Sequence, residues 1–291
     1  MSGRRPRKGA LAYPSAVSDA KHCRNGRTCA TALRVSKPIR KAAVPIAAAV
    51  ILVVCAGLLA FFASLPSVEP LRKTNPSSTA MMDTRAEEAK AHHHPVKRVW
   101  KWVPLSRISP WLQKAVVNSE DARFFDHDGI DMVETEVALE KAAEQHKLGR
   151  GASTISQQLA KNLWLGEERS LWRKVREAVL ARKLETLGKE RILELYLNVA
   201  EWGDGVYGAE AASRYWFHKP ASSLLPEEAA LLTAMLPAPR TRNPRHPSEH
   251  LRRRAFTVLK LYGLYGQLTP EQVAEARKYL GEMVTGPVAT R

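Results

Sequence analysis

Residues 151–161 read GASTISQQLAK, a stretch whose apolar positions have helical spacing and whose polar positions are unusual for a helix surface. Ser153, Gln157 and Lys161 are four residues apart, so a helix places them in a row along one face. The isoleucine and leucine side chains occupy another face. Solvent-facing helix surfaces are more often filled with Glu and Lys, whereas a hydroxyl, an amide and an ammonium in one row suit a phosphate or sugar ligand. The stretch therefore predicts a helix with a ligand-binding face.

A basic segment follows at residues 169–177, RSLWRKVRE, in which four cations lie within eight residues and one carboxylate ends the run. Cations at this density bind a diphosphate well, because a planar guanidinium group can pair with two phosphate oxygens at once. The alternative is a basic surface helix, with Arg173 and Glu177 as an exposed i,i+4 pair worth only about 0.3–0.5 kcal/mol. On this segment alone the two interpretations are equally supported.

Upstream, residues 120–129 read EDARFFDHDG and begin with two adjacent carboxylates, Glu120 and Asp121, close to aromatic residues. Burial and a neighbouring like charge raise the pKa of a carboxyl group toward the range in which it exchanges protons at neutral pH. The alternative is a solvated helix end with a Gly stop. This segment alone favours the solvated helix end.

Local start signals predict helices elsewhere. Ser109 and Pro110 supply an N-cap and a Pro at the first helical position, and Thr269 with Gln272 three residues later forms a capping box. Alternating strand patterns are scarce and the sequence shows no internal repeat. We therefore expect residues 96–285 to form one mostly α-helical domain.

The N-terminal part is organised around residues 42–65, which are 24 residues without a charge. About 20 apolar residues cross the ~30 Å hydrocarbon layer as a helix. The basic flank on the N-terminal side predicts that residues 1–41 stay in the cytoplasm and that the helical domain lies outside the inner membrane. Residues 66–95, which begin with several Pro and Ser, are expected to be a linker.

The basic composition belongs mainly to the N-terminal tail. Residues 1–41 hold 11 Lys and Arg against the single acid Asp19, a net of +10 out of the chain's +16. A basic tail beside a membrane segment explains this charge without a nucleic-acid partner. All three cysteines precede residue 56, so the exported part forms no internal disulfide.

Five segments, in their order and spacing, resemble the peptidoglycan glycosyltransferase family, glycosyltransferase family 51. The family pattern runs E-D-x-x-F-x-x-H-x-G, G-x-S-T-x-[ST]-Q-Q-x-x-K, R-K-x-x-E, I-L-E-x-Y-L-N with a following Gly, and an aromatic-Lys segment, which correspond to residues 120–129, 151–161, 173–177, 192–203 and 215–219. The resemblance covers about residues 96–245 and is specific because five motifs occur in order. One departure is local, since His218 stands where the family usually has Gly.

The resemblance implies a lysozyme-like helical fold and a lipid-linked substrate, the undecaprenyl-pyrophosphoryl disaccharide-pentapeptide called lipid II. By motif, Glu120 is expected to be the general base that deprotonates the 4-hydroxyl of the acceptor sugar, and Glu177 to act at the leaving diphosphate. No cofactor is expected to be required; a divalent cation, Mg²⁺ or Mn²⁺, is expected only as an aid at the diphosphate. The residues expected to bind the substrate are Asp121, Ser153, Thr154, Gln157, Gln158, Lys161, Arg169, Arg173, Lys174 and Arg176.

Two other functions belong to different classes. A lysozyme-like hydrolase would also use one Glu, but it has no diphosphate to hold, and the cations around Glu177 argue against it. An inactive scaffold that recruits other cell-wall enzymes is the non-enzymatic alternative, and the presence of both Glu120 and Glu177 argues against it. About 45 residues follow the matched region, too few for a penicillin-binding transpeptidase, so a monofunctional polymerase is expected. Its expected partners are lipid II, the growing glycan chain, the membrane and other cell-wall synthesis proteins.

Overall fold

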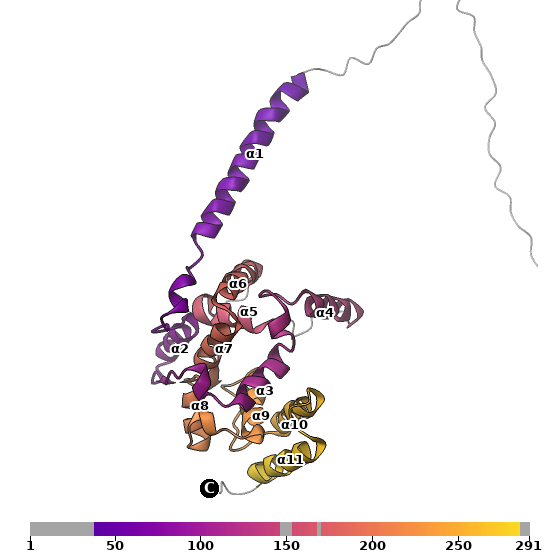
Figure 1. Cartoon of the computed structure of the whole chain (residues 1–291). Helices are drawn as coiled ribbons and strands as arrows, with labels where there is room; N and C mark the ends of the chain where they lie inside the picture. The colour runs from indigo at the N-terminus through magenta and orange to yellow at the C-terminus, as the bar shows by residue number, and fades with distance from the viewer. Residues whose placement is uncertain (1–37, 146–152, 168–169, 286–291) are drawn as a thin grey trace, which may run out of the picture. The chain divides into compact units, whose positions relative to one another are not determined.

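The computed structural model describes residues 38–145, 153–167 and 170–285 of the 291-residue chain. Most of these residues are helical, which confirms the mostly α-helical fold expected from the sequence. The α-helices, shown in Figure 1, are α1 (Pro38–Ala63), α2 (Ala80–Ala91), α3 (Pro110–Glu120), α4 (Met132–Gln145), α5 (Ile155–Ala160), α6 (Leu171–Leu184), α7 (Lys189–Val199), α8 (Ala209–Phe217), α9 (Pro226–Met235), α10 (Glu249–Leu264) and α11 (Pro270–Thr285). The shorter helical turns are the 3-10 helices η1 (Glu69–Arg72), η2 (Leu105–Arg107), η3 (Phe124–Asp126), η5 (Glu185–Leu187) and η6 (Ala221–Ser223), and the π-helix η4 (Lys161–Leu165).

Three short strands form one small sheet in the order β1-β3-β2. The strands are β1 (Val99–Trp100), β2 (Glu201–Gly203) and β3 (Val206–Tyr207). β1 runs parallel to β3, with Val99 opposite Val206, and β2 runs antiparallel to β3. The sheet therefore joins the chain before α3 to the segment that follows α7.

The chain divides into two compact units, residues 1–60 and 61–291. Within α1, Pro45–Ala63 is a 19-residue stretch long and apolar enough to cross a membrane. At 1.5 Å per residue it reaches about 28 Å, close to the thickness of the hydrocarbon layer. Most of the large apolar side chains on it are exposed, Leu52 and Leu59 among them, as expected of a helix that faces lipid.

The stretch 66–95, expected to be a linker, contains η1 and α2. Thr79 caps α2, its hydroxyl oxygen accepting the backbone N–H of Met82 at 3.2 Å. Met81, Met82 and Leu71 of η1 are buried, and α2 packs against η4. Both helices are therefore part of the packed domain, and the few apolar side chains in this mainly polar stretch hold them there.

The α-helices of the second unit pack mainly in two groups, which can be followed in Figure 1. In one group α9 packs against α3, α10 and α11, and in the other α5 packs against α6 and α7. Fully buried side chains fill both groups, such as Leu112 of α3 in the first and Leu180 of α6 in the second. The two groups meet where the backbone N–H of Ile155 donates to the carboxylate of Asp121 at 2.9 Å, directly after α3.

The predicted helix starts at Ser109 and Thr269 are confirmed. The Ser109 hydroxyl accepts the N–H of Trp111 at 3.3 Å, with Pro110 as the first residue of α3. At α11, Gln272 accepts the Thr269 N–H at 2.9 Å and Thr269 accepts the Gln272 N–H at 3.3 Å. These starts could be predicted because each depends on only a few neighbouring residues.

Candidate active site

Glu120 is the last residue of α3, and buried apolar residues of α3 such as Val116 fix its position. Its carboxylate lines a pocket of about 140 Å³, to which Ser153 and Thr154 also contribute. The side-chain amide of Gln158 on α5 donates to Glu120 Oε2 at 3.2 Å. The structure therefore brings together the first two sequence motifs, which are separated by more than 20 residues in the chain.

The electrostatic setting of Glu120 suits a group that takes up a proton. Burial raises the pKa of Glu120 above its ordinary value, and the neighbouring Asp121 acts in the same direction. The hydrogen bond from Gln158 and the charges of Arg254 and Arg242 oppose this rise. A carboxylate whose pKa is raised toward the working pH is a more effective general base than an ordinary surface carboxylate.

Asp121 is buried and holds the first two motifs together. Besides the N–H of Ile155, its carboxylate contacts His127 Nε2 at 3.0 Å. Burial raises the pKa of Asp121, while the Ile155 N–H and His127 oppose the rise. These contacts occupy the carboxylate oxygens with protein partners. The predicted role of Asp121 in substrate binding stays a prediction, because its contacts in the fold are structural.

The loop after α3 is fixed against α6 by Gly129. Its φ of +84° is a backbone conformation that side chains rarely adopt, and a Cβ atom there would lie 2.8 Å from the backbone of Ala181. The carbonyl of Gly129 accepts a hydrogen bond from the Thr154 hydroxyl at 2.7 Å. Gly129 therefore allows the first motif to approach both α5 and α6 closely.

Thr154 and Gln157 form a reciprocal capping box at the start of α5. The Thr154 hydroxyl oxygen accepts the N–H of Gln157 at 3.1 Å, and Gln157 Oε1 accepts the N–H of Thr154 at 3.0 Å. Gln157 is buried. Ser153 precedes the helix and Lys161 begins η4, so the single helical row predicted for Ser153, Gln157 and Lys161 is interrupted at both ends. Thr154 and Gln157 have the spacing of a capping box, as Thr269 and Gln272 do, so a local signal for this cap was present and was overlooked. The change to a π-helix had no such signal.

Glu177 on α6 lies between two cations. Its buried side chain accepts from Arg173 Nη1 at 2.5 Å and contacts Lys174 Nζ, and Arg173 is itself largely buried. This arrangement differs from the exposed surface pair that the spacing also allowed. Lys174 Nζ donates in addition to the Ser153 hydroxyl at 2.8 Å, which connects the second and third motifs. The result is a group of cations whose positions are set by one buried carboxylate.

Lys161 is the first residue of η4 and is partly buried. Burial lowers the pKa of Lys161, the carboxylates of Glu167 and Glu177 raise it, and the cations Arg173 and Arg85 lower it further. Lys161 therefore belongs to the same electrostatic environment as Glu177. A single π-helical turn inside a helix is often found at functional sites.

The remaining two predicted cations are less defined. Arg176 lies on α6, and within the described part of the chain its Nε is buried without a hydrogen-bond partner. Arg169 lies outside the described residues. The contribution of both residues to diphosphate binding stays a prediction.

Sequence reasoning did not select three residues around Glu120. Tyr196 on α7 is buried and donates its hydroxyl to Gln158 Oε1 at 2.9 Å, which orients the amide toward Glu120. Arg242 and Arg254 are the cations that oppose the rise in the pKa of Glu120. Tyr196 lies inside the fourth motif, where its helical spacing indicated a core residue, whereas the two arginines follow the last motif and carry no local signal.

Among the described residues, no group of three or more His, Cys, Asp or Glu is arranged to hold a metal ion. Cations of the protein occupy the surroundings of Glu177 instead. A divalent cation at the diphosphate therefore stays a prediction that requires a ligand oxygen from the substrate.

A helical domain with one carboxylate whose pKa is raised by burial and a second buried carboxylate among cations is typical of enzymes that act on charged substrates. Residues 87–262, more than half of the chain, match the family model described as transglycosylase. The chain belongs to this transglycosylase family, whose domain is lysozyme-like.

Relatives from several bacteria agree with this family. The biosynthetic peptidoglycan transglycosylase of Nitrosomonas eutropha is 45% identical over 189 residues, which cover 65% of this chain and 78% of the relative. That of Chromobacterium violaceum is 48% identical over 180 residues, 62% of this chain and 77% of the relative. That of Thiobacillus denitrificans is 46% identical over 189 residues, 65% of this chain and 81% of the relative. The family resemblance expected from the five motifs is confirmed.

Proposed function

We propose that this chain polymerises lipid II into β-1,4-linked glycan strands, with Glu120 as the general base and Glu177 with its cations at the leaving group. The observation that carries the proposal is the contrast between the two carboxylates. Glu120 is held by a neutral amide in a partly buried pocket, whereas Glu177 is buried between Arg173 and Lys174. Two acids with such different surroundings suit two different tasks in one reaction.

The enzyme class follows from the family: the chain is a peptidoglycan glycosyltransferase, and glycan chain polymerisation is its activity. For the reaction of the substrate we propose the following step. Glu120 takes the proton of the acceptor 4-hydroxyl, and the oxygen forms a bond to the anomeric carbon of the donor chain. The bond from that carbon to the diphosphate oxygen breaks with its electron pair, and the anomeric centre inverts from α to β.

The cations support this step because negative charge accumulates on the diphosphate as its bond to the sugar breaks. Contacts with Glu177 fix Arg173 and Lys174 before substrate arrives, and Lys174 also donates to Ser153. Lys161 lies in the same electrostatic environment. Preorganised cations aimed at developing charge are usually the largest single contribution to catalysis. A bound Mg²⁺ or Mn²⁺ would add charge at the same oxygens, and we propose it as an aid rather than a requirement.

The alternatives are less well supported. A lysozyme-like hydrolase of finished glycan has no diphosphate to neutralise, so its reaction would not explain the cations around Glu177. A scaffold without activity would need neither a carboxylate with a raised pKa at Glu120 nor a buried carboxylate at Glu177. Recruitment of other cell-wall synthesis proteins is compatible with polymerase activity.

The membrane segment fits the proposed substrate. One described helix is long and apolar enough to cross a membrane. We propose that it crosses the inner membrane once, with the basic tail in the cytoplasm and the helical domain outside, because the positive flank precedes the span. Lipid II keeps its polyprenyl tail in the bilayer, so an anchored enzyme meets its donor at the outer surface.

The test uses the full chain in detergent or vesicles with labelled lipid II. Wild-type protein is expected to form a glycan polymer that a muramidase digests, and Glu120→Gln is expected to form it about 10²- to 10⁴-fold more slowly. If the wild type forms no polymer, or if Glu120→Gln equals it, the proposal fails. Release of soluble fragments from finished glycan would assign the hydrolase instead.

A further inference from the structure

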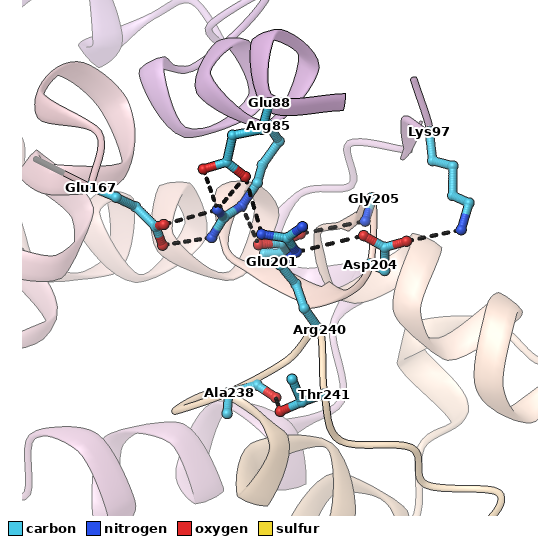
Figure 2. Close-up of polar contacts among 10 residues, drawn as sticks. All are labelled: Arg85, Glu88, Lys97, Glu167, Glu201, Asp204, Gly205, Ala238, Arg240 and Thr241. Carbon is cyan, nitrogen blue, oxygen red and sulfur yellow. Dashed lines mark hydrogen bonds and ion pairs between the residues drawn. The ribbon is translucent and has the colours of Figure 1, made fainter. Parts of the chain in front are cut away.

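A cluster of ion pairs lies on the side of the domain where α2 meets the end of η4, and Figure 2 shows it. Arg85 of α2 is at its centre. Its guanidinium group forms two parallel hydrogen bonds with the carboxylate of Glu167, Nη1 to Oε2 at 2.8 Å and Nη2 to Oε1 at 2.5 Å. The same group reaches Glu88 at 3.0 Å and Glu201 at 3.3 Å. One arginine therefore ties three carboxylates from separate parts of the chain together.

The inner part of this cluster is shielded from solvent. The side chain of Arg85 is only 13% exposed and that of Glu201 only 6%. Burial alone would lower the pKa of Arg85, but the three carboxylates hold it above its ordinary value. The two parallel hydrogen bonds fix the orientation of the Glu167 carboxylate as well as pairing its charge, because a planar guanidinium group binds a carboxylate at two points.

The outer part of the cluster is exposed and has weaker contacts. Arg240 pairs with Glu88 at 3.1 Å and with Asp204 at 3.6 Å, and Lys97 pairs with Asp204 at 2.9 Å. Both Lys97 and Asp204 have mostly exposed side chains. Exposed pairs of this kind contribute little on their own. The outer part therefore offers a comparison in which charge is removed without touching Glu167.

Glu167 is placed between two elements of the proposed leaving-group site. It follows η4, which begins at Lys161, and it precedes Ser170, the N-cap of α6. The backbone turns at Gly166 with a φ of +64°, where a Cβ atom would lie 3.1 Å from Thr84 Oγ1 of α2. The turn is thus in close contact with α2 at the residue before Arg85.

The two charge systems overlap at Lys161. The backbone carbonyl of Lys161 accepts the N–H of Gly166 at 3.0 Å, which ties Lys161 to the turn that carries Glu167. The charges of Glu167 and Glu177 raise the pKa of Lys161, and those of Arg173 and Arg85 lower it. The position of this turn and the charge of Glu167 therefore both affect a cation that the proposed reaction uses.

We propose that Arg85 is a positioning residue for the leaving-group side of the reaction, holding Glu167 so that the turn after η4 and the charge around Lys161 are fixed for the diphosphate. This inference rests on the proposed function. It gives α2, a helix of the packed domain that precedes the first motif, an indirect part in diphosphate handling. Arg85 itself touches no reacting atom.

The test replaces Glu167 and leaves Arg85 in place. Loss of Arg85 would leave the buried carboxylate of Glu201 without its charged partner, a change that strongly destabilises a fold. The side chain of Glu167 is 45% exposed, so the Glu167→Gln variant is expected to keep the fold. The kcat of Glu167→Gln is expected to be about ten-fold lower than that of the wild type. Loss of an exposed ion pair changes an equilibrium only a few-fold, whereas displacing a catalytic group lowers the rate about a hundred-fold, and the expected effect lies between these two values. KM is expected to change little, because the diphosphate charge develops in the transition state.

A second readout separates positioning from simple stabilisation. Glu167 raises the pKa of Lys161, so Glu167→Gln is expected to shift the alkaline limb of the kcat profile to lower pH. Glu167→Asp retains the charge and is expected to restore that limb in part. The matched control is Asp204→Asn, which removes an exposed carboxylate from the outer part of the cluster and is expected to leave kcat and the profile unchanged.

The outcomes distinguish this inference from the proposed function. If wild type and Asp204→Asn polymerise lipid II and Glu167→Gln behaves as they do, the inference fails and the polymerase remains. A Glu167→Gln chain that is only less stable, with an unchanged pH profile, also overturns it. A wild-type chain that forms no polymer refutes the proposed function first. Amide hydrogen exchange at residues 164–167, expected to be faster in Glu167→Gln alone, reports the loss of positioning without any activity.

Discussion

The side-chain amide of Gln158 donates to the carboxylate of Glu120 at 3.2 Å, joining the end of α3 to α5. The amide is held in this direction from its other end, where Tyr196 donates its hydroxyl to Gln158 Oε1 at 2.9 Å. A neutral donor stabilises the ionised carboxylate without cancelling its charge. The amide therefore favours the ionised form of the proposed base and, with the charges of Arg254 and Arg242, opposes the rise in pKa that burial causes.

Replacing Gln158 by Leu is expected to move the pH dependence of the reaction. The amide lowers the pKa of Glu120, so its loss raises that pKa further. A general base acts only when ionised, and the acidic limb of the kcat/KM profile is therefore expected to shift to higher pH. Tyr196→Phe, which keeps the amide next to Glu120, is the matched control and is expected to shift the limb less. An unmoved limb in Gln158→Leu would show that the amide does not tune the base.

Replacing Glu120 by Gln is expected to reduce polymerisation by about 10²- to 10⁴-fold while making the fold more stable at neutral pH. Burial raises the pKa of Glu120 above its ordinary value of 4.5, so the folded chain binds more protons than the unfolded chain just above that pH. The wild type therefore loses stability as the pH rises from 4.5 through the pKa of Glu120 in the folded chain. The Glu120→Gln variant does not lose this stability, because its amide stays neutral.

Denaturant unfolding of both proteins at pH 4 and pH 7 measures this effect. The stability gain of Glu120→Gln over the wild type is expected to be larger at pH 7 than at pH 4. A gain that is equal at both values, or larger at pH 4, would contradict a raised pKa at Glu120. The comparison uses no substrate and is therefore independent of the polymerisation assay.

The sequence was sufficient wherever a feature depends on neighbouring residues. The start of α3 at Ser109 and Pro110 and the capping box at Thr269 needed only local signals. The five ordered motifs similarly identified the family because their order needs no tertiary structure. The contact between Glu120 and Gln158 could not be predicted from residue patterns, since it depends on how two groups of helices pack.

Burial was the main property that the sequence left open. The spacing of Arg173 and Glu177 is the same in an exposed pair and in the buried arrangement found here, and only packing around α6 distinguishes them. Met81 and Met82 are adjacent rather than spaced at three or four residues, so α2 shows no amphipathic pattern and its stretch resembled a linker. Both differences arise because tertiary contacts, not local periodicity, decide which side chains are covered.

Replacing Glu177 by Gln is expected to lower both stability and polymerisation. The buried carboxylate holds Arg173 and Lys174, and its neutralisation leaves these cations without their charged partner, at a cost of about 1–3 kcal/mol. The matched control is Glu69→Gln, which removes an Arg pair of similar spacing whose side chains are exposed. It is expected to change stability by less than about 1 kcal/mol. Thermal or denaturant unfolding of the two variants decides whether burial accounts for the difference.

The capping residue Gln157 provides a separate test of what holds the site together. Gln157→Ala removes the acceptor of the buried Thr154 N–H and is expected to destabilise the fold by about 1–2 kcal/mol. Gln272→Ala removes the equivalent acceptor at α11, where the contact with Thr269 is exposed, and is expected to cost less, because water can replace it. If Gln157→Ala instead leaves unfolding unchanged and only raises KM, the residue binds substrate as its motif implies, and the capping box is not its main role. Comparing the losses in unfolding free energy of Gln157→Ala and Gln272→Ala therefore distinguishes a helix-capping role of Gln157 from a role in substrate binding.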